Sequence, residues 1–294
     1  NLWSRTKRWK NRREKERIIE EYINGIDLDG NNIHLDNEDG LLSSGTPQIQ
    51  NTWMDAKIGN IVVTPRNGKA IEINALWYNA LKIMESFANL YKEKELSKKY
   101  AELAKKCKES FIKKFYNKKR KCFDDLVGDN SIRPNQLFAI GLHYPVVEPN
   151  SVEVKTAFET VTKKLLTPYG LKTLAKGEKC YREIYEGDQI KRNMSYHQGI
   201  TWPWLLGIYS DSFLNIISAE KNKTKKKELE EQYSKFAQNV EDTFYNEMYN
   251  RSTVGSISEL YDSAKPYEAK GAFAQAWSVA EVFRIIEKRN KWES

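Results

Sequence analysis

Apolar residues recur at helical spacing along this chain of 294 residues, and that periodicity constrains the fold more than any other feature. Side chains three and four positions apart lie on one face of an α-helix, where they can form a core stripe. The stripes are Leu76, Ala80, Ile83, Phe87, Leu90; Leu96, Tyr100, Leu103, Cys107, Phe111, Phe115; Val154, Ala157, Phe158, Val161, Leu165; Leu229, Tyr233, Phe236, Val240, Phe244; and Phe273, Trp277, Ala280, Phe283. With residues 2–23, 133–142 and 201–218 they predict about eight helices, whereas only residues 60–64 and 180–185 have the pattern of strands. The sequence therefore predicts an all-α protein.

Long polar connections at residues 27–64, 166–198 and 246–269 separate these helices. Helices of a simple bundle are joined by about two to eight residues, and longer loops usually carry function. Helices alternating with long loops are typical of an α/α barrel or toroid whose loops form the rim of a pocket. No break in composition marks a linker, so we expect a single domain over residues 1–294. The first predicted helix resembles one cut from something larger, so we also expect a fragment of a larger protein.

The net charge of +8 is concentrated in two segments. Residues 1–20 hold 8 basic and 3 acidic side chains, and residues 92–121 hold 13 basic and 4 acidic ones. In the second segment the lysines lie opposite the apolar stripe, which favours a solvated helix face over a nucleic-acid-binding surface. No apolar run approaches the roughly 18 residues of a membrane span. We therefore expect a cytoplasmic protein with no nucleic-acid or membrane partner.

Several common catalytic motifs are missing from the sequence. It contains no Walker-type loop, no Gly-x-Gly-x-x-Gly and no Gly-x-Ser-x-Gly elbow. The histidines (His34, His143, His197) lie far apart, and the cysteines (Cys107, Cys122, Cys180) lack the spacing of metal ligands or of a disulfide framework. We therefore expect no metal and no organic cofactor. Carboxylates and aromatic residues remain as the candidates for chemistry.

Two carboxylates stand out because each lies in a long loop beside aromatic residues. Asp55 follows Trp53 and Met54, which could desolvate it, raise its pKa and suit it to act as a general acid. A helix or turn cap is the simpler explanation for Asp55 alone. Glu259 comes about 200 residues later, just before the last helix, and alone it is typical of a surface glutamate. As a pair from separate loops, however, they match what a glycosidase requires.

Aromatic residues gather in the same loops. Trp77 and Tyr78 follow Asn74, and residues 196–199 lead into Trp202 and Trp204. A sugar site needs flat aromatic platforms with polar side chains at their edges. Core packing is the safer explanation for any single tryptophan. Five of the eight nevertheless lie beside loops or helix starts, which favours a cleft: Trp53, Trp77, Trp202, Trp204 and Trp277.

These segments together resemble a known family. In order they are Thr52-Trp53-Met54-Asp55-Ala56-Lys57, Val63-Thr64-Pro65-Arg66, Glu72-Ile73-Asn74-Ala75-Leu76-Trp77-Tyr78, Arg133-Pro134-Asn135-Gln136, Tyr196-His197-Gln198-Gly199, Trp202-Pro203-Trp204 and Ser256-Ile257-Ser258-Glu259. From about residue 25 to residue 284 the chain resembles the C-terminal amylo-α-1,6-glucosidase domain of glycogen debranching enzymes. The ordered set is specific even though each motif alone is not.

The resemblance implies an (α/α)6 barrel and an inverting hydrolase that removes the single α-1,6-linked glucose at a trimmed branch point of glycogen or limit dextrin. It implies Asp55 as general acid and Glu259 as general base, with carboxyl groups roughly 6.5–9.5 Å apart to admit a water. Candidates for binding the sugar are Trp53, Lys57, Asn74, Trp77, Tyr78, Gln136, His197, Gln198, Trp202 and Trp204.

The resemblance also predicts that this chain lacks part of the barrel. Such a barrel has twelve helices, so we expect the first few, and an upstream domain, to be absent from this chain. Two alternatives stay open: another inverting α-glucosidase on the same barrel, and a catalytically inactive glucan-binding fragment. The sequence leaves the linkage preference, the glucan length and the oligomeric state open.

Overall fold

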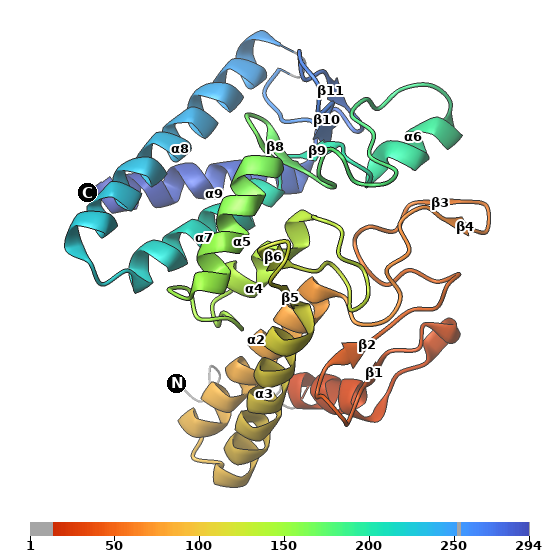
Figure 1. Cartoon of the computed structure of the whole chain (residues 1–294), viewed down its shortest axis with the longest axis vertical. Helices are drawn as coiled ribbons and strands as arrows, with labels where there is room; N and C mark the ends of the chain where they lie inside the picture. Colours follow the sequence, from red (N-terminus) through yellow and green to blue (C-terminus); the bar gives the residue numbers. More distant parts are fainter. Residues whose placement is uncertain (1–13, 252–253, 294) are drawn as a thin grey trace, which may run out of the picture.

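The structure, a computed structural model, describes residues 14–251 and 254–293 (Figure 1). The helix expected over residues 2–23 falls partly outside this range: residues 14–24 are helical, and residues 1–13 lie outside the described residues. The further helices are α2 (Ile71–Leu90), α3 (Lys94–Phe115), α4 (Phe138–Gly141), α5 (Val152–Lys164), α6 (Gln189–Tyr196), α7 (Leu205–Ala219), α8 (Lys223–Asn250) and α9 (Ala276–Glu293). Short 3-10 turns lie at η1 (Leu28–Gly30) and at η2 (Pro134–Leu137), which leads into α4.

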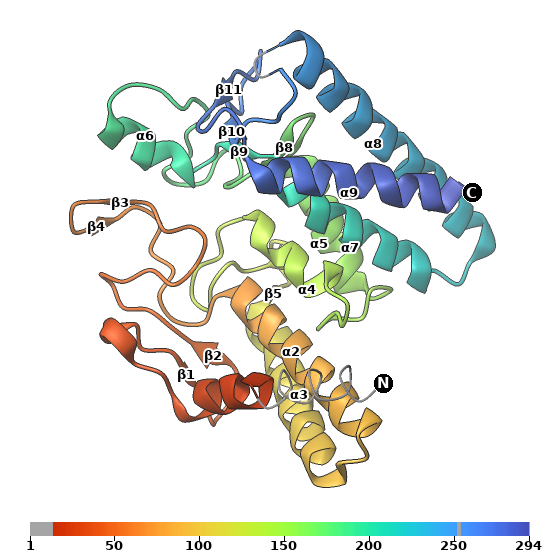
Figure 2. The ribbon, with the colours of Figure 1, turned by 180° about the vertical axis from the view of Figure 1, so that it is seen from behind.

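The helices form an inner and an outer row. The inner row is α2, α4, α7 and α9, in which each helix packs on the next. On the outside, α3 packs along α2, α5 against α7, and α8 against both α7 and α9 (Figures 1 and 2). The expected all-α class with an α/α arrangement is thus confirmed.

Short strands occupy the end of the helix layers where the long loops lie. A five-stranded antiparallel sheet has the order β11–β10–β9–β8–β7, and three hairpins pair β1 with β2, β3 with β4 and β5 with β6. The bounds are β1 (His34–Leu35), β2 (Leu42–Ser43), β3 (Lys57–Ile58), β4 (Ile61–Val62), β5 (Tyr116–Asn117), β6 (Cys122–Phe123), β7 (Leu166–Thr167), β8 (Gly170–Lys172), β9 (Thr201–Trp202), β10 (Leu260–Tyr261) and β11 (Ala269–Lys270). In the larger sheet Thr201 pairs with Tyr261, which joins two loops about sixty residues apart in sequence.

Local chemistry explains the sharp start of the outer helices. Ser151 caps α5 by accepting a hydrogen bond from the amide of Val154 at 3.2 Å, and Asn222 caps α8 by accepting one from the amide of Lys225 at 3.0 Å. Such caps satisfy amides that have no partner inside the helix and contribute about 1 kcal/mol each. The stripes predicted for α3, α5 and α8 are confirmed, because most of their residues are buried and the others pack against the core.

The stripes predicted for two inner helices are wrong. On α2, Leu76 is 41% exposed and Leu90 is 72% exposed, while Trp77, Tyr78, Leu81 and Met84 are buried instead. On α9 the predicted stripe also faces outward: Phe283 is 70% exposed, and the buried residues are Ser278, Val282 and Ile285. Both helices carry apolar residues on more than one face, so periodicity alone does not identify the face that packs.

The strand predictions are half right. Residues 60–64 contain β4, but residues 180–185 form no strand. That segment instead exchanges single hydrogen bonds with separate loops: the amide of Arg182 donates to the carbonyl of Gln198 at 2.6 Å, and the carbonyl of Glu183 accepts from Ser263 at 2.8 Å. Among the described residues, no helix combines the length and the apolar character needed to cross a membrane.

Candidate active site

The conspicuous loops converge where inner helices begin. The N-terminal ends of α2, α7 and α9, together with η2 ahead of α4, lie toward the short strands (Figure 2). The loops that reach these helix starts carry Asp55, His197 and Glu259. Three loops remote in sequence therefore meet at one end of the helix layers.

Trp53 is the centre of an aromatic cluster at this end. Its ring meets His197, Trp202 and Trp204 edge-on, at centroid distances of 5.2, 5.6 and 5.0 Å. Its indole Nε1–H donates to Oδ1 of Asn135 at 2.8 Å. The following residue, Met54, is fully buried. Trp53 and Met54 thus anchor the chain directly before Asp55.

A buried ionic network fixes the partner of Trp53. Asn135 donates its Nδ2–H to Oδ1 of Asp125 at 2.8 Å. Asp125 in turn accepts from Nε of Arg66 at 2.7 Å, and the same guanidinium is also bidentate to Glu72. All three ionic side chains are 3% exposed or less. Burial lowers the pKa of Arg66, but the charges of Asp125 and Glu72 outweigh it and raise that pKa overall, so the guanidinium stays charged.

Hydrogen bonds tie the loop that carries Asp55 to the region of α6. The carbonyl of Lys57 accepts from Nδ2 of Asn193 at 3.0 Å. Further along, Nε2 of Gln198 donates to the carbonyl of Val63 at 2.9 Å and to Oγ1 of Thr64 at 3.1 Å. These contacts lie on both sides of Tyr196 in sequence, so the loop after Asp55 is tied to the segment that carries this tyrosine.

Glu259 stands at the start of β10 and is partly buried. Its Oε1 accepts a hydrogen bond from the hydroxyl of Tyr196 at 2.6 Å, and its Oε2 accepts from the backbone amide of Ala272 at 3.0 Å. The carboxylate also lines an open hollow of about 590 Å³ together with Tyr185, Arg192 and Lys270. The Glu259 carboxylate is therefore fixed by hydrogen bonds beside a cavity, unlike that of a typical surface glutamate.

Tyr196 connects the two loops. Burial raises the pKa of this phenol most, followed by its hydrogen bond to Glu259 and the charges of Glu259, Tyr185 and Asp55. Asp55 and Glu259 are therefore both within electrostatic range of one hydroxyl, although they are about 200 positions apart in sequence. The Tyr196 ring also lies 4.7 Å from His197 and 4.9 Å from Trp202, inside the same aromatic cluster.

His197 is neutral in this environment. It is 1% exposed and stacks on Trp202 with an interplanar angle of 23°. Burial lowers the pKa of His197 to about 3, with smaller contributions from the charges of Arg133 and Arg66. Its carbonyl is fixed by the guanidinium of Arg133 at 2.7 Å, which also donates to Oε1 of Gln198 at 3.0 Å. The ring therefore contributes shape and stacking without a positive charge.

The expectation that Trp53 and Met54 desolvate Asp55 is wrong. Asp55 is exposed, because both neighbours turn inward to pack and leave its carboxylate on the solvent side. The local sequence placed apolar residues next to Asp55 along the chain but not around its side chain.

Several residues predicted to contact the sugar make hydrogen bonds or packing contacts within the fold. Asn74 is fully buried, with its amide bonded to the backbone of Leu42 and Ala70. Trp77 donates to the carbonyl of Gly40 at 3.2 Å, and Tyr78 is buried in the core. Gln136 accepts from the amide of Phe123 and donates to the carbonyl of Arg133. Lys57 is exposed and its Nζ donates to the carbonyl of Gln48 at 2.7 Å.

The structure adds residues that the sequence had not marked as site residues. Tyr196 was visible only as the residue before His197. Trp277 stacks on Trp204 at 5.0 Å with an interplanar angle of 16°, yet its side chain remains 38% exposed. Asn135 accepts a hydrogen bond from Trp53 and donates one to Asp125, so both residues help to position Trp53. Within the described part of the chain, no three His, Cys, Asp or Glu side chains are grouped as a metal ion would require.

Comparison with known proteins agrees with this geometry. A family model described as amylo-alpha-1,6-glucosidase matches residues 8–284. The glycogen debranching enzyme of Saccharomyces cerevisiae (strain ATCC 204508 / S288c) is 27% identical over 229 residues, a match that covers 62% of this chain and 15% of that relative. The chain thus spans only a small part of that relative.

Solved structures share the fold. A chain described as a sialidase superposes with a TM-score of 0.63 at 14% identity, over 94% of this chain and 23% of the other. The neutral trehalase from Saccharomyces cerevisiae superposes with a TM-score of 0.50 at 13% identity, over 76% of this chain and 39% of the other. At such identities the likeness concerns the fold alone, and it agrees with an (α/α)6 barrel.

Proposed function

Since this chain belongs to the amylo-α-1,6-glucosidase family, we propose that it is a glycoside hydrolase that removes α-1,6-linked glucose at the branch points of a branched α-glucan such as glycogen or limit dextrin. We propose a single α/α-barrel domain as its catalytic unit. One observation carries the proposal: a cluster of tryptophans around Trp53 anchors the chain beside Asp55 and also contacts Tyr196, whose hydroxyl donates to Glu259 from a separate loop. Two carboxylates beside aromatic platforms suit acid–base cleavage of a glycosidic bond.

Glu259 is the better general base of the two. Tyr196 and the amide of Ala272 both donate to its carboxylate, which orients the two oxygens beside the hollow. An ionised carboxylate can deprotonate the attacking water, as the inverting mechanism requires. The hollow beside Glu259, about 590 Å³ in volume, has room for that water and for part of the substrate.

Asp55 takes the complementary role of general acid. Its exposure lets a glycosidic oxygen reach it, and Trp53 holds the backbone beside it. A glucose unit bound against the cluster would cover Asp55 and bring the glycosidic oxygen within reach of its carboxyl group. Asp55 then protonates the glycosidic oxygen while Glu259 deprotonates water on the opposite face of the sugar, which inverts the anomeric centre.

Trp277 is the strongest candidate for the sugar platform. Its partial exposure and its stacking on Trp204 suit it to offer a rigid apolar surface to the C–H groups of a sugar. Nε1 of Trp204 and Nδ1 of His197 are buried without a hydrogen-bond partner among the described residues. Such atoms are rare in folded proteins, and a water or a sugar hydroxyl bound beside them would satisfy them.

The test uses a branched limit dextrin and proton NMR of the first product. Release of β-glucose is expected, and α-glucose as the first product would refute inversion. Asp55→Asn and Glu259→Gln should each lower kcat by about 10²- to 10⁴-fold, because each removes one proton transfer. Glu268→Gln, an exposed carboxylate on the loop that follows β10, is the matched control and should retain activity.

The substrate panel separates the open alternatives. Hydrolysis of trehalose or kojibiose in preference to isomaltose and panose would assign another linkage to the same barrel. Glucan binding by calorimetry that survives both substitutions, with no glucose released by the parent chain, would instead identify a non-catalytic binding domain.

A further inference from the structure

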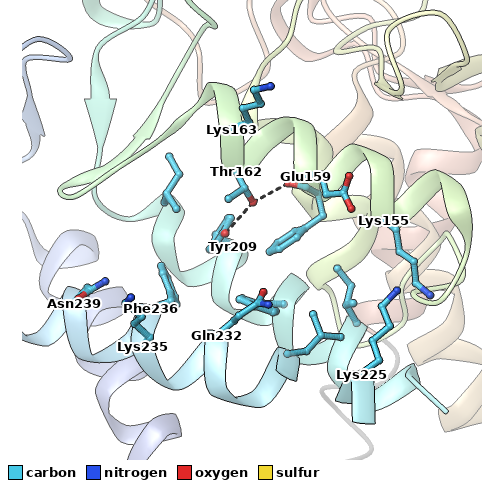
Figure 3. Close-up of a pocket in the computed structure, with 15 residues that line it drawn as sticks. Lys155, Glu159, Thr162, Lys163, Tyr209, Lys225, Gln232, Lys235, Phe236 and Asn239 are labelled. Carbon is cyan, nitrogen blue, oxygen red and sulfur yellow. Dashed lines mark hydrogen bonds between the residues drawn. The ribbon is translucent and has the colours of Figure 1, made fainter. Parts of the chain in front are cut away.

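A groove on the outer row of helices lies away from the loops that carry Asp55 and Glu259. It runs between α5 and α8 with α7 beneath it, and it encloses about 510 Å³ (Figure 3). That volume is within the range of small-molecule sites, roughly 300–1,000 Å³. Neither the family nor the proposed reaction assigns it a ligand.

The floor of the groove is apolar. It is formed by Phe158, Tyr209, Phe213, Ile216, Leu229 and Phe236. The two hydroxyls in the floor bond to each other, since Oγ1 of Thr162 lies 2.9 Å from Oη of Tyr209 (Figure 3). A ligand on this floor therefore meets no unpaired polar group. A sugar ring, which needs donors and acceptors around its edge, is poorly matched to it.

The rim of the groove is cationic. Four lysines line it, Lys155 and Lys163 from α5 and Lys225 and Lys235 from α8, against one carboxylate, Glu159 (Figure 3). Lys155 is paired with Glu220 at 3.3 Å. The other three lysines make no ion pair with any described residue. An anionic group at the rim would therefore gain attraction without displacing an existing partner.

The groove is long and narrow. It shares Leu166, Phe236 and Asn239 with a second hollow of about 460 Å³, which extends it along α8 to Thr243. From Lys225 to Thr243 the helix rises about 27 Å at 1.5 Å per residue. The floor residues Tyr209, Phe213 and Ile216 are only 2%, 6% and 5% exposed. So little open apolar surface suits a single alkyl chain better than an α-helix, whose diameter with side chains is about 10–12 Å.

We propose that this groove binds a linear amphiphilic anion, a free long-chain carboxylate whose alkyl chain lies on the aromatic floor and whose carboxylate meets one of the unpaired lysines of the rim. The apolar floor selects the chain, the lysines select the charge, and the continuous length selects a linear shape. The groove does not depend on the glycosidase activity proposed above, so an experiment can refute either proposal without refuting the other.

Calorimetric titration of the purified chain with sodium decanoate and sodium dodecanoate, below the concentrations at which they form micelles, tests the proposal. Each added methylene should tighten binding about fourfold, hence about 15-fold from decanoate to dodecanoate. Dodecyltrimethylammonium should bind at least tenfold more weakly than dodecanoate. Equal affinity for the cation, or no dependence on chain length, would overturn the proposal.

Substitutions locate the site. Lys225→Glu or Lys235→Glu should weaken dodecanoate binding at least fivefold, whereas Lys227→Glu, exposed on the same helix and outside the groove, should not. Gln232→Trp places an indole over the groove from the exposed side of α8 and should abolish binding without removing a core contact. Binding that ignores both rim substitutions, or survives Gln232→Trp, contradicts this location.

A thermal melt distinguishes binding from denaturation. A ligand of the native state raises Tm, so saturating dodecanoate should raise it and the rise should vanish in Gln232→Trp. A fall in Tm would identify dodecanoate as a denaturant and overturn the proposal. The proposal would also fail if an acidic amphipathic peptide, maltoheptaose or anionic phospholipid vesicles bound at the groove while dodecanoate did not.

Discussion

Replacing Arg66 with methionine should be among the most destabilising single substitutions in this chain. The guanidinium donates to two buried carboxylates, Asp125 and Glu72, through four N–H groups in bidentate pairs. Methionine fills similar space but carries no charge, so both carboxylates lose their main partner. Leaving one member of a buried ion pair uncompensated costs about 3–5 kcal/mol of unfolding free energy.

The loss of unfolding free energy should stay near about 3–5 kcal/mol instead of doubling, although two carboxylates lose a partner. Asp125 retains a second cation, because Nε of Arg133 lies 3.6 Å from its Oδ2. Glu72 keeps only the favourable N-terminal end of α2, where it occupies the first turn. Most of the cost therefore falls on Glu72. At about 2–4 °C per kcal/mol for a chain of this size class, Tm should fall by about 6–20 °C.

Urea denaturation followed by tryptophan fluorescence and circular dichroism measures this loss. Arg17→Met is the matched control: its pair with Glu21 is 70% and 44% exposed, so its loss should stay below about 0.5 kcal/mol. The difference in unfolding free energy between the two variants should narrow at acid pH, because protonated carboxyl groups cost less to bury than ionised ones. If Arg66→Met loses less than about 1 kcal/mol, or the difference widens in acid, the reasoning fails.

Two further predictions concern the candidate site. Gly271 has φ of +71°, and a Cβ there would meet Oε2 of Glu259, whereas Gly255, with φ of +77°, has open space. Both alanine variants should lose about 1–2 kcal/mol, but only Gly271→Ala should also lower kcat severalfold on limit dextrin; equal kcat values would refute a role for that contact. Because burial lowers the pKa of His197 to about 3, below its value of about 6.5 when unfolded, its contribution to stability is present above about pH 6.5 and is lost as pH falls toward 3. In urea titrations the parent chain should lose about 1 kcal/mol of unfolding free energy per pH unit between about pH 6 and pH 4, and His197→Phe should not show this loss. Parallel plots of unfolding free energy against pH for the two proteins would contradict the prediction.

Sequence periodicity predicted the outer helices better than the inner ones. An outer helix such as α3 packs on one side and is solvated on the other, so its buried residues Tyr100, Cys107, Phe111 and Phe115 repeat cleanly. An inner helix such as α2 meets neighbours on several sides. Trp77 and Leu76 are adjacent in sequence, yet one is 3% exposed and the other 41%. Only the tertiary packing decides between such residues.

The sequence predicted several residues of the candidate site, but not the hydrogen bonds that connect them. The sequence indicated both carboxylate loops and the tryptophans around Trp53. It contained no signal that the hydroxyl of Tyr196 reaches Glu259, or that Asn135 links Trp53 to Asp125, because these contacts join positions 63, 82 and 10 residues apart. The two-residue strand β9 is likewise fixed by its pairing with remote β10, not by local propensity.

Asp55 and Glu259 differ in a way that bears on how such a site would work. Glu259 has hydrogen-bond donors built into the fold, so its carboxylate is oriented before any ligand arrives. Asp55 is exposed, and only the backbone beside it is held, through Trp53 and Met54. Folding therefore prepares the base, while the environment of the acid depends on what binds over the tryptophan cluster. In the mechanism proposed above, a sugar that fails to cover this cluster leaves Asp55 in open solvent, which links recognition of the terminal glucose to the proton transfer that cleaves its glycosidic bond.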